Sequence, residues 1–188
     1  IREFDSGVAR LEGLSLAVAV ATVRAMEECG ISGVAVKWPN DLLWQSRKLG
    51  GILLEMKGDV AGVCQVIIGI GINISASVEQ MKEVDQAWVN AETITGTHVS
   101  RNLLAGKITK HLLNAIRQFD ESGFAGFKQE WESLDAFREC AIEVSNAGKE
   151  QKIKGISKGV TDTGALKVET RQGLRIFNGG EVRLKSSI

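Results

Sequence analysis

The sequence is poor in the residues that build metal sites and disulfide frameworks. Its 188 residues include three cysteines, Cys29, Cys64 and Cys140, which are widely spaced and form no CxxC pair. This usage predicts a reducing compartment and no zinc site. The two histidines, His98 and His111, both lie in polar surroundings, which argues against a multi-histidine centre. The side chains therefore predict no metal site.

Long apolar runs and an excess of one charge are also lacking. The longest apolar run, residues 14–23, is too short to cross a bilayer, and no signal peptide is recognisable. Lys+Arg and Asp+Glu number 23 each, so the formal charge gives no electrostatic reason for non-specific binding to nucleic acid or membranes. We expect a cytoplasmic protein. Because the chain begins with Ile1 and not Met, we expect it to be part of a longer protein.

The apolar content of 44% is enough for a sizeable core in one domain, or in a core domain with a small appendage. Apolar periodicity predicts helices over residues 13–30 and 101–122, with Ser100 as the N-cap of the second. Strands are predicted over 34–38, 50–56 and 62–72, the last lying centrally in a sheet. A short helix is expected within 75–99 and another within 124–131.

The pattern changes near Asp135. Five short alternating segments follow, at residues 141–145, 151–160, 165–169, 174–177 and 181–185, separated by turns rich in glycine. Strands this short at this spacing predict a small antiparallel barrel. We therefore expect two parts, residues 1–135 and 136–188.

Three motifs could carry chemistry. The first, residues 37–41 (KWPND), is a strand that holds Lys37 at its end, followed by the only proline and two polar residues. Read alone, it favours an ordinary strand end with an Asn-Asp turn over a functional site. The second, residues 47–55 (RKLGGILLE), opens an apolar strand with two glycines, which indicates a close approach to the backbone or a plain hairpin turn.

The third motif, residues 69–74 (GIGINI), leaves one strand face without side chains, which suits a flat ligand ring or a closely packed neighbour. It is not a dinucleotide fingerprint, because no GxGxxG opens a helix there. The amide of Asn73 could read an adenine edge or cap a strand. Trp88 could stack on a nucleobase, although a tryptophan in a hydrophobic core is the usual case.

The order and spacing of KWPND, RKLGGILLE and GIGIN resemble the biotin protein ligase family, and the resemblance extends over essentially the whole chain. It implies an α+β fold, with a mixed sheet and helices related to class II aminoacyl-tRNA synthetases, plus a C-terminal SH3-like barrel. It implies two half-reactions. Biotin and ATP, with Mg²⁺, form biotinoyl-5'-AMP, and biotin then passes to a lysine of the biotin carboxyl carrier protein of acetyl-CoA carboxylase.

The resemblance also implies roles for individual residues. Lys48, Lys37 and Asp41 would be catalytic, with Lys48 at the junction of biotin and phosphate and Asp41 orienting the incoming lysine or taking its proton. The biotin slot would be lined by Lys48, Gly51, Leu53, Gly69, Ile70 and Gly71. The nucleotide would contact Asn40, Asn73, Trp88 and Lys185.

The family's upstream arginine- and glycine-rich loop has no counterpart in residues 1–13, so we expect this chain alone to have little or no activity. Three alternatives stay open: a biotin- or adenylate-sensing module, a dimerisation module of a transcriptional repressor, and a lipoate ligase relative. A homodimer is possible. DNA binding would require a further N-terminal domain.

Overall fold

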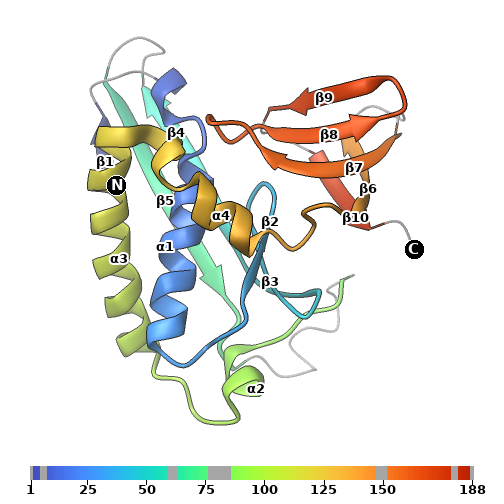
Figure 1. The fold of residues 1–188 in the computed structure, drawn as a ribbon. Coiled ribbons are helices and arrows are strands. Elements are labelled where there is room, and N and C mark those ends of the chain that lie inside the picture. Colours follow the sequence, from blue (N-terminus) through green and yellow to red (C-terminus); the bar gives the residue numbers. More distant parts are fainter. Residues whose placement is uncertain are drawn as a thin grey trace.

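The computed structural model describes residues 2–4, 8–58, 63–75, 86–146, 152–178 and 182–186. These residues form two five-stranded antiparallel sheets and a set of helices (Figure 1). Sheet A has the strand order β1-β5-β4-β3-β2, and sheet B the order β10-β6-β7-β8-β9. The expected combination of sheet and helices is confirmed.

Sheet A is built mainly from consecutive strands. They are β1 (Arg2–Phe4), β2 (Ala35–Lys37), β3 (Asp41–Trp44), β4 (Arg47–Gly58) and β5 (Cys64–Ile72). Every strand pairing among the described residues is antiparallel, and parallel contact is limited to two isolated bridges. The mixed sheet that we expected is therefore not observed, because β2, β3 and β4 follow one another through connections too short for a parallel crossover.

Helices cover one face of sheet A. The two long ones, α1 (Leu14–Glu28) and α3 (Arg101–Ser122), lie side by side over it (Figure 1). Both confirm the predicted positions, and the hydroxyl of Ser100 accepts the N–H of Leu103 as an N-cap should. The shorter helices are η1 (Val8–Leu11), α2 (Ala91–Thr95), η2 (Gly123–Gly126) and α4 (Lys128–Leu134).

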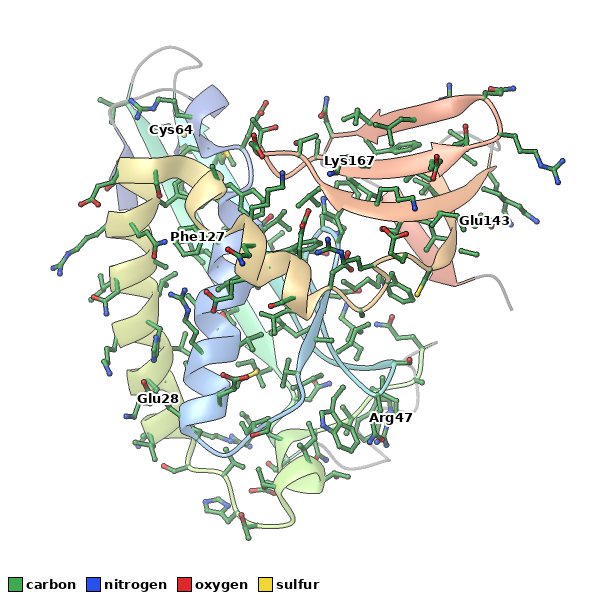
Figure 2. The ribbon with its side chains drawn as sticks, viewed as in Figure 1. Glu28, Arg47, Cys64, Phe127, Glu143 and Lys167 are labelled. Carbon is green, nitrogen blue, oxygen red and sulfur yellow. The ribbon has the colours of Figure 1, made fainter. Side chains whose placement is uncertain are left out.

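At the C-terminal end of α1, Glu28 contacts cationic side chains from the N-terminal half of α3 (Figure 2). Its carboxylate lies 2.7 Å from Nζ of Lys107 and 2.7 Å from Nε2 of His111. Hydrogen bonds from Lys107 and then His111 lower the pKa of Glu28 to about 2. Although its neighbours in the sequence are polar, the His111 side chain is only 17% exposed, because its ring lies against Glu28 at the end of α1.

Sheet B follows α4 and confirms the five predicted short strands. They are β6 (Ala141–Asn146), β7 (Lys152–Val160), β8 (Leu166–Thr170), β9 (Gly173–Phe177) and β10 (Val182–Ser186). The described strands form an open sheet with β9 and β10 at its edges, without the closure of a barrel.

Sheet B joins the rest of the molecule at the turn before β8. Gly164 lies against Gly13 and Leu16, and its carbonyl oxygen accepts a 2.9 Å hydrogen bond from Nε1 of the buried Trp38. Buried side chains of both sheets belong to one continuous hydrophobic core.

Candidate active site

The KWPND segment forms a tight connection between β2 and β3. Lys37 and Asp41 are register partners, so the two strands meet directly at this point. Asn40 secures the turn against β4, since it accepts from the N–H of Ile52 and donates its side-chain amide to the Ile52 carbonyl, both at 2.9 Å. Trp38 is buried beneath and the Trp38–Pro39 peptide bond is cis. The strand end is thus held from both sides.

Asp41 binds two ammonium groups at once. Its Oδ2 lies 2.9 Å from Nζ of Lys37, and its Oδ1 lies 2.6 Å from Nζ of Lys48. The Asp41 side chain is 13% exposed. Burial alone would raise the pKa of Asp41, but hydrogen bonds from Lys48 and Lys37 outweigh burial and hold this pKa below its ordinary value. Asp41 is therefore ionised at neutral pH.

The three side chains of this cluster have a net positive charge. One carboxylate balances only one of the two ammonium groups, so the formal charge of Lys37, Lys48 and Asp41 together is one positive unit. Cations held in place by a partly buried carboxylate need little rearrangement to receive an anion. The cluster suits two anions that must be brought together.

Beside the cluster, three glycines leave part of the outer face of sheet A without side chains. Gly51 pairs with Gly71, and Leu53 pairs with Gly69. Cβ atoms added at Gly69 or Gly71 would meet no atom closer than 3.6 Å, so this face is open. Gly50 differs, because a Cβ there would overlap the carbonyl oxygen of Gly71. The double glycine thus serves close strand packing at its first position and an open surface at its second.

Ile70 is the exception among the predicted biotin-slot residues. Side chains alternate along β5, so Ile70 faces opposite to Gly69 and Gly71 and packs against the hydrophobic core. On the open face it offers only its backbone. Leu53, which is 60% exposed, is a large apolar side chain on that face, and Ile67, which is 43% exposed, lies further along it.

A cavity of about 370 Å³ adjoins the glycine face and the lysine cluster. It is lined by Lys48, Gly50, Gly51, Gly71, Ile72, Asn73, Gln86 and Trp88. Trp88 is fixed beside Lys48 by backbone hydrogen bonds, from Lys48 N–H to Ala87 O at 2.8 Å and from Val89 N–H to Lys48 O at 2.9 Å. Gln86 was not singled out from the sequence, because no pattern marks it.

Asn73 links two of the segments that line this cavity, β4 and residues 86–91. Its side-chain amide donates to the carbonyls of Lys48 and Val89 at 3.3 and 3.2 Å, and its backbone pairs with Leu49 and Ala91. It therefore holds the 86–91 segment against β4. The amide protons that we expected to meet adenine are used within the protein.

Lys185 lies apart from the other predicted site residues. Its backbone is in β10 opposite Glu143, and its side chain lies outside the described residues. The other predicted site residues described above lie together at one side of sheet A: Lys37, Asp41, Lys48, Gly51, Leu53, Gly69, Gly71, Asn73 and Trp88.

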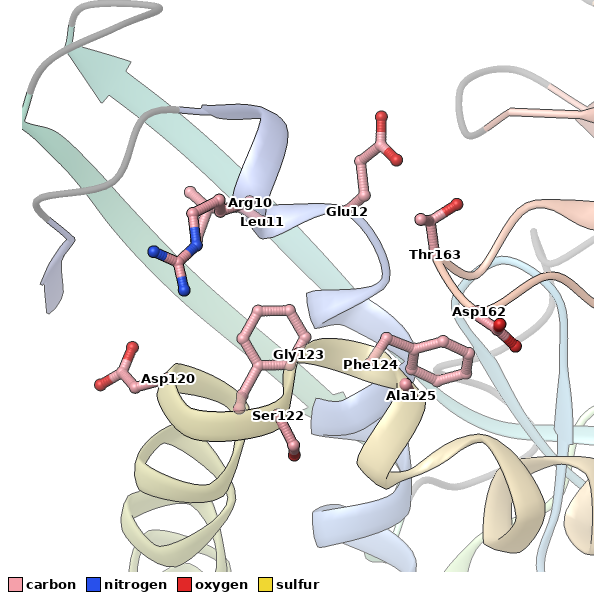
Figure 3. Close-up of a pocket in the computed structure, with 11 residues that line it drawn as sticks. Arg10, Leu11, Glu12, Asp120, Ser122, Gly123, Phe124, Ala125, Asp162 and Thr163 are labelled. Atoms are coloured by element: carbon pink, nitrogen blue, oxygen red, sulfur yellow. The ribbon is translucent and has the colours of Figure 1, made fainter.

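Another hollow, of about 230 Å³, lies between η1, the end of α3, η2 and the turn before β8 (Figure 3). Its ionisable lining residues are Arg10, Glu12, Asp120 and Asp162. Asp162 already forms a 2.6 Å ion pair with Lys128, and none of the motif residues lines this hollow. It is therefore separate from the lysine cluster.

The described residues contain no group of three or more metal-ligating side chains. Within the same residues, no helix is both long and apolar enough to cross a membrane.

Comparisons with known proteins agree with this geometry. Residues 4–73 match the biotin/lipoate A/B protein ligase family, and residues 141–185 match the biotin protein ligase C-terminal domain. A biotin--[acetyl-CoA-carboxylase] ligase of Paracoccus denitrificans is 30% identical over 173 residues, covering 90% of this chain and 71% of that protein. The chain belongs to the biotin protein ligase family.

Other members of the family extend the match. The bifunctional ligase/repressor BirA of Escherichia coli is 35% identical over 183 residues, covering 97% of this chain and 56% of BirA. This chain thus spans little more than half the length of that relative. The biotin protein ligase of Aquifex aeolicus in complex with biotin and ATP has 26% identity and a TM-score of 0.80, covering 98% of this chain and 77% of that structure.

Proposed function

We propose that this chain provides part of a site that activates biotin with ATP to biotinoyl-5'-AMP and transfers biotin to a lysine of a carboxylase carrier domain. The observation that carries the proposal is the pair Lys37 and Lys48 on Asp41, at the edge of a glycine-lined face and a 370 Å³ cavity. The solved Aquifex aeolicus relative with biotin and ATP supports the choice of ligands.

In the first step, an oxygen of the biotin carboxylate attacks the α-phosphorus of ATP. The new oxygen–phosphorus bond replaces the bond to the β-phosphate oxygen, and pyrophosphate leaves. Both reactants are anions, so the surplus positive charge of Lys48 and Lys37 lowers the barrier to their approach. Lys48 lines the cavity and is assigned the central role.

In the second step, the amine of the carrier lysine attacks the acyl carbon of biotinoyl-AMP, and AMP leaves with the electrons of the broken bond. The attacking nitrogen must lose protons. Asp41 is an anion with a lowered pKa, which suits it better to orient the incoming ammonium group than to keep a proton. We therefore assign Asp41 the orienting role among the two that its position allows.

The ligands would divide the site between them. The ring of biotin fits the open face at Gly51, Gly69 and Gly71, which carry no side chains, with Leu53 beside them as an apolar contact. The adenine fits against Trp88, whose indole can stack on a flat base. Asn73 would act by holding Trp88 in place, and Asn40 by fixing the β2–β3 turn.

Mg²⁺ does not find a ligand set among the described side chains. Asp41 is the carboxylate nearest the reacting groups, and both its oxygens are engaged by lysines. We therefore assign no step to protein-bound Mg²⁺.

The proposal is tested by calorimetry with stable sulfamoyl analogues of biotinoyl-AMP and lipoyl-AMP. The chain should bind the biotinoyl analogue at least tenfold more tightly, on the order of 1.4 kcal/mol. Lys48→Ala should weaken that binding, whereas Lys57→Ala, an exposed lysine further along β4, should not. Tighter binding of the lipoyl analogue would reassign the chain to lipoate transfer, and binding of neither would contradict the proposed site.

Several expectations stay predictions. We keep the boundary between residues 135 and 136, because the strands of sheet A precede residue 75 and those of sheet B follow residue 140. The same proposal includes four further expectations. Sheet B closes into an SH3-like barrel, and Lys185 contacts the nucleotide. The protein forms a homodimer and is cytoplasmic. Low activity of this chain alone also remains to be measured, as does any DNA binding through a further domain.

A further inference from the structure

The outermost strand of sheet B has an open edge. β9 pairs with β8 along one side, and among the described strands it has no neighbour on the other (Figure 1). An edge strand presents N–H and C=O groups that can pair with another extended chain, and proteins usually protect such an edge with charge or a covering segment. This edge is therefore a candidate for strand addition.

The outer face of β9 is apolar. Leu174 and Ile176 are 58% and 50% exposed, and they lie opposite Glu169 and Lys167 of β8. Figure 2 labels Lys167 on this sheet. These two side chains lie two positions apart on an edge strand and expose apolar surface to water. Such exposed apolar surface often marks a place where another molecule binds.

The other face of β9 borders a basic hollow of about 420 Å³. Arg175 projects to this side, as the register partner of the buried Val168, and the hollow is also lined by Lys152, Lys154 and Arg171. Lys152 is paired with Glu143 at 3.2 Å. No salt bridge joins Lys154, Arg171 or Arg175 to another described residue, and no carboxylate lines the hollow.

We propose that β9 and this basic hollow form a docking surface for an extended acidic segment of a partner protein. The segment adds as a further strand along β9. Because side chains alternate in a strand, a segment with acidic and apolar residues in turn directs its carboxylates to Arg175 and the neighbouring Arg171, and its apolar side chains to Leu174 and Ile176. Charge complementarity and the open edge select this partner.

A nucleic acid fits this surface less well. Phosphates would engage the cations but would leave Leu174 and Ile176 exposed, and they would not pair with the open backbone of β9. The whole chain has no excess of positive charge that would favour a polyanion in general.

The probe is a fluorescein-labelled decapeptide of alternating glutamate and valine, added to the 188-residue chain and followed by fluorescence anisotropy and amide chemical shifts. We expect saturable binding, with the largest shifts in β9. Arg175→Glu should weaken binding at least tenfold. Arg117→Glu makes the same charge change on the exposed side of α3, far from sheet B, and should leave binding unchanged.

A second variant, Ile176→Lys, tests the apolar half and should also weaken binding at least tenfold. A peptide of alternating lysine and valine should not bind. The proposal is overturned if the acidic peptide fails to bind, if Arg175→Glu and Arg117→Glu weaken binding equally, or if a single-stranded oligonucleotide of ten nucleotides binds more tightly than the peptide.

Discussion

Lys48 reaches Asp41 across the β3–β4 hairpin, with Nζ 2.6 Å from Oδ1. Lys48 lies opposite Leu43 in the ladder, on the far side of an irregularity in the register, so the contact depends on the local bend of the hairpin. The ion pair places a cation from the second motif beside the carboxylate of the first. Three of the predictions below depend on this hairpin or on the turn that holds it.

Replacing Lys48 by alanine should abolish most adenylate formation. We expect a loss of about a hundredfold or more in biotin-dependent pyrophosphate release by the intact ligase, as on removal of one preorganised donor to a developing charge. Lys57→Ala is the matched control. Normal pyrophosphate release by Lys48→Ala would show that Lys48 is only a structural partner of Asp41.

Asp41→Ala should reduce transfer from preformed biotinoyl-AMP more than it reduces adenylate formation, because we assign Asp41 to the incoming lysine. Single-turnover transfer to a carrier domain measures the first quantity, and pyrophosphate release the second. Equal loss in both steps would mean that Asp41 acts only by holding the two lysines.

Asp41 should also contribute to stability in a pH-dependent way. Its pKa is lowered in the folded state, so its contribution is present above about pH 4, the ordinary range of aspartate, and is lost as the pH falls through the lowered value. Asp41→Asn should therefore reduce the free energy of unfolding at pH 7 by about 1 to 3 kcal/mol, with the difference shrinking in acid. Urea titrations at several pH values measure this difference in unfolding free energy between the wild type and Asp41→Asn. A difference that does not change with pH would mean that the ion pairs of Asp41 do not contribute to stability.

Asp135 should make the stability depend on pH in the direction opposite to that of Asp41. Burial raises its pKa to about 6, and its Oδ2 is buried without a described hydrogen-bond partner, while Oδ1 accepts from Phe137 N–H. The folded state then binds more protons than the unfolded state between about pH 4 and pH 6, so this residue makes stability fall as the pH rises through that window. Asp135→Asn should flatten this slope in urea titrations. An unchanged slope would contradict the raised pKa.

Gly164→Ala should destabilise the junction of the two sheets. Gly164 has a φ of 84°, and an added Cβ would lie 2.8 Å from Cα of Gly13 and 2.9 Å from Cδ1 of Leu16. Gly30→Ala is a matched control, since Gly30 has a φ of 78° with no atom within 4 Å. Thermal unfolding should show Gly164→Ala to be less stable than Gly30→Ala by about 1 to 3 kcal/mol. If both variants lose the same stability, the positive φ alone, and not the close contacts of Gly164, explains the loss.

Much of the fold could be predicted from the sequence because local signals agree with the tertiary arrangement. Ser100 caps the helix that its position predicts, and the glycine-bounded segments after Asp135 all become strands. The β3–β4 hairpin was missed because its turn residues, Gln45 and Ser46, both adopt positive φ without being glycine. No turn signal in the sequence marks that position.

The candidate site was predicted in part. Spacing and resemblance brought Lys37, Asp41 and Lys48 together, and the contacts between them are present. The pattern of glycines could not tell that Ile70 faces the core, because the face of a strand depends on its register. Nor could it tell that the Asn73 amide is occupied by two carbonyls of the protein itself, since those acceptors come from distant segments.

The hydrogen bond from Trp38 to the carbonyl of Gly164 has an evolutionary consequence. Strands can be assigned to an N-terminal and a C-terminal part, yet Trp38 of the KWPND segment in the first part is anchored by a turn of the second part. The two parts are therefore not freely interchangeable modules. A chimera with the C-terminal sheet of another family member should work only where the donor's turn returns a carbonyl to the same place beneath the indole.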